Sequence, residues 1–278
     1  MKVSICDRQL WLNYLSIISL ISAILSLVLL FVDIPKNVKN PCSIGMIAIL
    51  VILFFVLWGR ANYMQRVTLK INDSEVVIEK GDIFDGEGYR VIPFNEYFDT
   101  QVDNGLISSK TINGQFLQKN STAIRYIENQ IDNDSAANSN IVREISNRVP
   151  GKKKQYKLGT IVKYENYFIL AFSKFDDRNR AYLKMDEYIS CLLHMWDECD
   201  RQYNGESITM PLLGSGITRF RCHKNITDQE LLEMILWTFE LSSIRFRYQS
   251  KLRIVLTDDS LKNINLYEIK RIFKSKGE

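Results

Sequence analysis

Near residue 60, the chain changes from uninterrupted apolar sequence to alternating apolar and polar positions. Residues 9–32 and 40–59 contain no charged side chain and are rich in Leu, Ile and Val, and the polar segment between them carries a proline. Each apolar run is close to the ~20 residues that a helix needs to cross the core of a bilayer. The pattern predicts a transmembrane hairpin with helices at about 10–32 and 42–59. A cleaved signal peptide has a shorter apolar core and would not explain the second run.

Basic residues are slightly more numerous outside the turn of this hairpin than inside it. By the positive-inside rule, the excess predicts that both ends of the hairpin face the cytoplasm. The basic residues are Lys2 and Arg8 before the first helix, Lys36 and Lys39 in the turn, and Arg60, Arg66 and Lys70 after the second helix. Neither span contains Asp, Glu, Lys, Arg or His, so nothing indicates an ion pathway. The hairpin is interpreted as an anchor or an assembly device.

Small residues recur at helical spacing along the first apolar run. They are Ser16, Ser19, Ser22, Ala23 and Ser26. Small side chains let membrane helices approach closely, and hydroxyl groups can form hydrogen bonds across the contact. Two interpretations are open: packing within the hairpin against Gly45 and Ala48, or self-association between molecules.

After residue 60, short alternating strands are interspersed with amphipathic helices. The pattern predicts strands at 67–71, 75–79, 89–94, 158–164, 167–172, 207–210 and 252–256, and helices at 124–131, 141–145, 181–203, 227–241 and 266–273. Residues 150–155 are interpreted as an exposed basic connection. Strands that alternate with helices predict an α/β fold in three layers, with helices on both faces of a mixed sheet. We therefore expect two domains, residues 1–60 and residues 61–278.

Composition and charge exclude several classes of function. The net charge of +4 is too small to indicate a nucleic-acid partner, and the five cysteines show no CxxC spacing. Neither a zinc site nor a disulfide framework is predicted. Scattered, reduced thiols fit a cytosolic compartment, and we expect no metal and no cofactor.

Three polar stretches follow predicted strands. They are Gly81-Asp82-Ile83, then Asn95, and then a glycine-containing loop that precedes a predicted helix and comprises Leu213, Gly214, Ser215, Gly216, Ile217, Thr218 and Arg219. In open α/β sheets, ligands bind outside the carboxyl ends of the strands. A carboxylate can accept from an adenine amine, an amide can bind ribose hydroxyl groups, and backbone N–H groups of a glycine loop can hold a diphosphate.

This set of residues resembles the macro domain, an ADP-ribose-binding α/β/α fold. The resemblance implies that Asp82 and Ile83 bind adenine, that Asn95 faces the distal ribose, and that residues 213–218 hold the diphosphate. Two interpretations are open for Arg219: it adds positive charge near the phosphates, or it is a salt-bridged arginine of the surface. The Asn-Ala-Ala-Asn run that is common in the family is absent, and Asn95-Glu96-Tyr97-Phe98-Asp99-Thr100 stands in its place.

The segments 92–100, 107–110 and 113–116, together with the two apolar helices, are similar to the macro-type effectors of bacterial Thoeris anti-phage defence. That resemblance implies a multi-pass protein of the bacterial inner membrane with a cytoplasmic macro-type domain. In this family, a TIR-domain partner consumes NAD and makes an ADP-ribose derivative. The effector senses the derivative, forms a homo-oligomer and disrupts the bilayer, which stops the infected cell.

Three functions are weighed on this sequence. The leading hypothesis is a membrane-anchored sensor without catalytic residues. The second is a tethered ADP-ribosyl or ADP-ribose-phosphate hydrolase in which Asp99 or Asp103 activates water, although the sequence shows no paired nucleophile and base. The third is a purely structural anchor.

Overall fold

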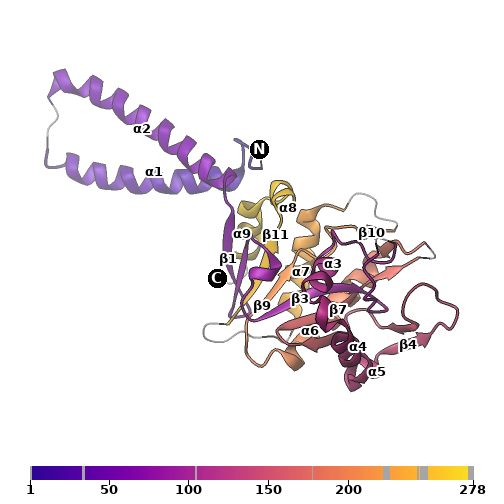
Figure 1. The fold of residues 1–278 in the computed structure, drawn as a ribbon. Coiled ribbons are helices and arrows are strands. Elements are labelled where there is room, and N and C mark those ends of the chain that lie inside the picture. Colours follow the sequence, from indigo (N-terminus) through magenta and orange to yellow (C-terminus); the bar gives the residue numbers. More distant parts are fainter. Residues whose placement is uncertain are drawn as a thin grey trace. The chain divides into compact units, whose positions relative to one another are not determined.

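The computed structural model describes residues 2–32, 35–103, 105–176, 178–221, 226–242, 244 and 250–274. Contacts divide the chain into two compact units (Figure 1). One comprises Met1–Gln65 and Asn265–Glu268, and the other comprises Arg66–Ile264 and Ile269–Glu278. The expected boundary at residue 60 falls inside a helix that continues to Asn62.

The first unit is a hairpin of two long apolar helices, α1 (Arg8–Leu29) and α2 (Lys36–Asn62). The Asp7 side chain caps α1 by accepting from the N–H group of Leu10 at 2.9 Å. Mean hydropathy reaches 2.2 over Arg8–Leu29 and 2.6 over Lys39–Asn62. By length and composition, both helices are able to cross a membrane.

The two helices pack through aromatic and aliphatic side chains. Leu10, Tyr14 and Phe54 form the buried contact, and the Tyr14 hydroxyl donates to the Leu50 carbonyl at 3.1 Å. The small residues of α1 lie elsewhere: Ser16, Ser19, Ser22, Ala23 and Ser26 are all exposed, as are Gly45 and Ala48 of α2. Of the two interpretations of this stripe, packing within the hairpin is therefore not what the structure shows.

The second unit is built on a nine-stranded mixed sheet with the order β1-β2-β11-β9-β3-β7-β8-β10, in which β6 also pairs with β7. Strands β2, β11, β9, β3 and β7 run parallel. Strand β1 pairs antiparallel with β2, and β6 and β8 pair antiparallel with β7, while β10 pairs parallel with β8. The strands are β1 (Arg66–Ile71), β2 (Ser74–Lys80), β3 (Tyr89–Asn95), β6 (Ile161–Tyr164), β7 (Tyr167–Phe175), β8 (Ala181–Leu183), β9 (Ile208–Pro211), β10 (Arg219–Phe220) and β11 (Lys251–Leu256).

Helices cover both faces of this sheet. Ile169 and Ala171 of β7 belong to the core formed with α3 (Ile112–Lys119) and α4 (Ile124–Asn133). On the opposite face, Phe172 meets the Tyr188 ring of α6 with centroids 6.0 Å apart. Alternate residues of a strand point to opposite faces, so the unit has three layers, as predicted. The other helices are α6 (Met185–Gln202) and α7 (Asp228–Leu241), which pack together, and α5 (Ser135–Ser139), α8 (Asp258–Asn263) and α9 (Leu266–Lys274), with short 3-10 turns at Ile83–Asp85 and Ser121–Ala123.

Two predictions of secondary structure are wrong. The expected helix at 141–145 is strand β4 (Ile141–Glu144), which pairs antiparallel with β5 (Lys154–Tyr156), so part of the expected basic connection is also a strand. The expected helix at 181–203 begins only at Met185, because Ala181–Leu183 forms β8. In both places, pairing with another strand outweighs the local helical spacing of apolar residues.

Candidate functional site

The topology brings the three predicted stretches to one edge of the sheet. Strands β2, β11, β9 and β3 are parallel neighbours, so their carboxyl ends lie side by side. Asp82 follows β2, residues 212–218 follow β9, and Asn95 ends β3. This edge is where α/β sheets usually bind ligands.

Asp82 is exposed at the start of the short turn Ile83–Asp85. One carboxylate oxygen accepts from the N–H group of Phe84 at 3.0 Å, and the other has no hydrogen bond within the part of the chain described. Ile83 is 4% exposed and packs in the core on the α3 side of the sheet. Asp82 therefore presents an acceptor at the edge, while Ile83 holds the turn in place.

The loop after β9 is buried at Leu213, half-buried at Gly214 and Ser215, and exposed at Gly216 and Ile217. Gly214 has φ +93°, a conformation that favours glycine, and a Cβ there would lie 3.0 Å from Phe220 Cζ. The Leu213 carbonyl accepts from the Tyr188 hydroxyl at 3.0 Å. Gly216 faces open space, since a Cβ there would have nothing within 4 Å, and Ile217 is 63% exposed.

This loop precedes helix α7, as predicted, but a short strand lies between the two. Thr218 is half-buried, and Arg219 opens strand β10, which pairs parallel with β8 before α7 begins at Asp228. The ring of Phe220 packs edge-on against Tyr188 at 5.4 Å, which draws the chain back to the sheet. Arg219 itself is exposed.

Asn95 is buried, with 2% of its surface exposed, and its amide is engaged within the protein. Its Oδ1 accepts from the N–H groups of Tyr97 and Asp99 at 3.0 and 3.3 Å. Its Nδ2 donates to Asp99 Oδ2 at 2.9 Å. The remaining amide N–H is the group that Asn95 has left to offer a ligand.

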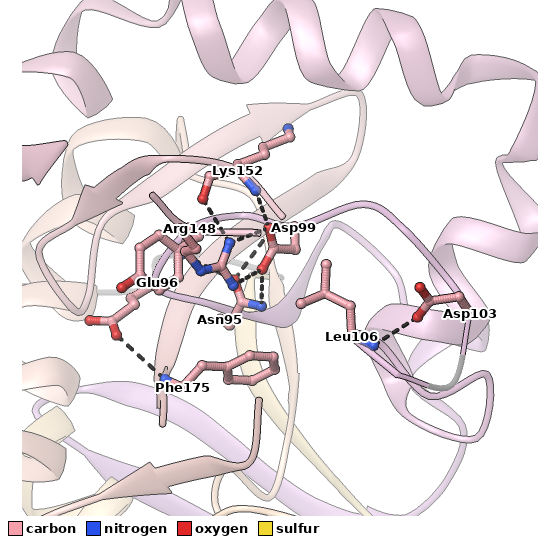
Figure 2. Close-up of polar contacts among 9 residues, drawn as sticks. Asn95, Glu96, Asp99, Asp103, Leu106, Arg148, Lys152 and Phe175 are labelled. Carbon is pink, nitrogen blue, oxygen red and sulfur yellow. Dashed lines mark hydrogen bonds and ion pairs between the residues drawn. The ribbon is translucent and has the colours of Figure 1, made fainter. Parts of the chain in front are cut away.

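Asp99 is the centre of this network, as Figure 2 shows. Its carboxylate is fully buried and accepts from Arg148 Nη1 and Nη2 at 2.9 and 2.6 Å, from the N–H group of Lys152 at 2.7 Å and from Asn95. The Arg148 guanidinium also lies 3.7 Å above the Tyr97 ring. Arg148 and Lys152 belong to the connection between β4 and β5.

Sequence reasoning missed Arg148 and Lys152. The sequence places Lys152 in a solvated connection, yet its Nζ is buried without a hydrogen-bond partner among the described residues, and burial lowers the pKa of this lysine. Its opposing charge is Glu128, 3.9 Å away. No local signal marks a partnership between Asp99 and residues 49 and 53 positions further along the chain.

Beside Asn95, Glu96 borders a cavity of about 280 Å³. Glu96 is 3% exposed and accepts from Gln155 Nε2 at 2.6 Å, and burial raises the pKa of its carboxyl group. None of the predicted ligand residues lines this cavity. Its walls are Glu96, Val142, Gln155, Tyr156, Lys157, Leu158, Lys174, Asp186, Glu187, Ser190 and Cys191.

The two carboxylates considered for catalysis, Asp99 and Asp103, both accept hydrogen bonds from other groups of the protein. Asp99 accepts only from protein donors within the described residues, and none of its surface is exposed. Asp103 accepts from the N–H groups of Leu106 and Gly105 at 2.7 and 2.9 Å, and the hydrogen bond from Leu106 lowers the pKa of Asp103 (Figure 2). Across the same described residues, no three His, Cys, Asp or Glu side chains group as a metal site.

A three-layer α/β/α unit with an acidic turn after one parallel strand and a glycine loop after another defines a macro-type domain. The family model described as the macro domain of Thoeris protein ThsA matches residues 76–257. The chain is also 37% identical over 268 residues to Thoeris protein ThsA of Bacillus amyloliquefaciens (strain Y2), in an alignment that covers 94% of this chain and 89% of that protein. The chain therefore belongs to the Thoeris ThsA macro-domain family, a family of anti-phage defence proteins, as its resemblance implied.

The solved structures that resemble this chain include macrodomains of low sequence identity. An asparagine-to-alanine mutant of the Oceanobacillus iheyensis macrodomain has a TM-score of 0.49 and 14% identity, and the match covers 77% of this chain and 96% of the macrodomain. A glycine-to-valine mutant of the same macrodomain, solved with ADPR, has a TM-score of 0.48 and 13% identity, and the match covers 75% of this chain and 99% of the macrodomain.

Proposed function

We propose that this protein is a membrane-anchored sensor that binds an ADP-ribose derivative at the carboxyl edge of its sheet and has no chemistry of its own. The observation that carries the proposal is the pairing of an exposed carboxylate, Asp82, with an open backbone loop at 213–218 on the same edge. Asp82 accepts from the adenine amine, and the N–H groups of the loop hold the diphosphate. The remaining N–H of Asn95 donates to the distal ribose.

The hydrolase alternative receives less support from the geometry. A general base needs an accessible oxygen within hydrogen-bond reach of the attacking water. Asp99 is enclosed by its four donors, and Asp103 is bound to the turn that it caps. Neither carboxylate is placed to activate water at the predicted ligand edge.

For the membrane part, we propose that the hairpin lies in the bacterial inner membrane and assembles with copies of itself when the ligand binds. The exposed face of Ser16, Ser19 and Ser22 supports this because it is not used within the hairpin. Small residues of this kind mediate close helix contacts in bilayers. The ligand, made from NAD by a TIR-domain partner, would favour the assembled state by binding it more tightly than the resting state. The assembly then disrupts the membrane.

The test uses the full-length protein in lipid nanodiscs and titrates it with ADP-ribose by calorimetry. Gly216→Glu places a carboxylate in the open space beside the loop and is expected to lower the affinity for ADP-ribose by about tenfold or more through charge repulsion and blocked access. The matched control is Thr68→Glu, which adds the same charge on the exposed face of β1 and leaves binding unchanged.

Wild-type affinity in Gly216→Glu would remove the phosphate-loop assignment. Multiple turnovers of an ADP-ribosylated substrate would favour the hydrolase. Chemical crosslinking in liposomes tests the membrane half of the proposal, and an oligomer size that does not change with saturating ADP-ribose derivative would count against assembly.

A further inference from the structure

The loop 96–100, which replaces the usual asparagine-rich run, is buried along its whole length. The exposed fractions are 3% for Glu96, 5% for Tyr97, 0% for Phe98 and Asp99, and 9% for Thr100. A loop of this polarity is stable inside a protein only when its polar groups are paired. Here the partners come from the hairpin formed by β4 and β5, which pairs with Glu96 and Asp99, and also from β7 and α4, which pair with Glu96 and Thr100.

Arg148 joins this hairpin to the loop in two ways: it binds both oxygens of Asp99, and it lies over the ring of Tyr97. Within the hairpin, its Nη1 also donates to the Lys152 carbonyl at 2.7 Å. Its side chain is 11% exposed, so the ion pair is largely shielded from water. A bidentate pair between guanidinium and carboxylate fixes orientation as well as distance.

The same ion pair sets the direction of the Asn95 amide. Asp99 Oδ2 accepts from both Arg148 and Asn95, and Asn95 Oδ1 is held by two backbone N–H groups. The Asn95 side chain therefore cannot rotate without breaking bonds that Arg148 helps to organise. Its remaining N–H has one direction in which to meet a ligand.

We propose that Arg148 and Asp99 are positioning residues that give this protein its preference for a ligand with a distal ribose. This rests on the proposed function. Arg148 orients Asp99, and Asp99 orients Asn95 and the loop 96–100. The hairpin of β4 and β5 therefore contributes to ligand recognition. The contacts of Asp82 and of the loop 213–218 with adenine and diphosphate come from other strands and do not depend on this ion pair.

ADP lacks the distal ribose of ADP-ribose, so a comparison of the two nucleotides tests this proposal. Wild-type protein in nanodiscs is titrated with ADP-ribose and with ADP, and the ratio of the two dissociation constants is measured. In the double variant Asp99→Asn with Arg148→Met, neither member of the pair is left as an unpaired buried charge. We expect this variant to bind ADP as wild type does, and to lose about tenfold or more in affinity for ADP-ribose.

A second variant and a control complete the test. Arg148→Lys keeps the charge beside Asp99 but not the two-point contact, so its preference for ADP-ribose should lie between those of wild type and the double variant. The matched control is Asp73→Asn with Lys70→Met, which removes an exposed ion pair at the turn between β1 and β2 and should change neither affinity.

A general loss of stability would lower the affinities for ADP-ribose and ADP by the same factor, and that result would overturn the proposal. So would a wild-type preference for ADP-ribose in Arg148→Lys and in a folded double variant. If wild-type protein binds neither nucleotide, the proposed function itself fails. If it binds both equally, the ligand is recognised without its distal ribose and the positioning role is refuted.

Discussion

The two loops at the carboxyl edge of the sheet differ sharply, although they follow parallel strands that pair side by side. The loop after β3, residues 96–100, is buried and tied to a distant hairpin through Asp99. The loop after β9, residues 212–218, is buried at its start but is exposed at Gly216 and Ile217. The conformation of the loop 96–100 is thus fixed by contacts within the protein, whereas the loop 212–218 exposes backbone at Gly216 and Ile217.

The physical reason lies in how each loop satisfies its polar groups. A buried carboxylate requires donors from the protein, and Asp99 has them from Arg148, Lys152 and Asn95. An exposed glycine loop can leave its N–H groups to water, which a phosphate then replaces. The buried loop is therefore held rigidly, and the exposed loop keeps N–H groups available to a ligand. Each of the following substitutions changes only one of these loops.

The largest effect is expected from Arg148→Ala. It leaves the fully buried Asp99 without its cationic partner, which costs about 3–5 kcal/mol for an uncompensated buried charge. Denaturant unfolding of the full-length protein in detergent, followed by tryptophan fluorescence, measures the loss. Lys70→Ala, which removes an exposed ion pair at the turn between β1 and β2, should leave the midpoint close to that of wild type. Equal effects of the two substitutions would mean that the buried loop is no more dependent on its ion pair than the surface is.

A smaller effect is expected from Gly214→Ala in the open loop. Alanine at φ +93° is strained, and its Cβ would press on Phe220 and Leu231, so we expect a loss of about 1–2 kcal/mol of unfolding free energy. Gly216→Ala serves as the control in the same loop, since its Cβ meets nothing within 4 Å. If both alanine variants unfold at the wild-type midpoint, Gly214 does not need its left-handed conformation.

The smallest effect is expected from Glu96→Gln, and it depends on pH. Burial raises the pKa of Glu96 above its ordinary value of 4.5, so the folded state keeps the proton longer than the unfolded state does as pH rises. Wild-type stability therefore falls as pH increases from the unfolded to the folded pKa, and the variant lacks this loss. The amide that replaces the carboxyl group can still accept from Gln155. Unfolding at about pH 4 and about pH 7 should show the variant gaining on wild type at the higher pH.

A constant difference between Glu96→Gln and wild type across this range would show that the carboxyl group is not perturbed in the folded protein. In that case, the buried loop would be more accessible to water than the 3% exposure of Glu96 indicates.

Much of the architecture was predictable from residues close together in sequence. The uncharged runs at 9–32 and 40–59 determine the two long helices, and alternation determines strands such as β1 and β2. The strand ends at Asp82, Asn95 and the glycine loop were predictable as well. Local spacing of apolar residues failed at 141–145 and 181–183, where the chain pairs with the next or the preceding strand instead of forming a helix.

The amino-acid sequence by itself therefore determined the class of fold and the edge at which its polar residues gather, because both follow from periodicity along a strand or helix. Only the tertiary structure decided what each polar residue does there. Asn95 and Gly216 look equally available in sequence, yet one is enclosed and the other is open. The difference arises from Arg148 and Lys152, 49 and 53 residues from Asp99, whose contacts exist only once the hairpin of β4 and β5 has packed against the sheet.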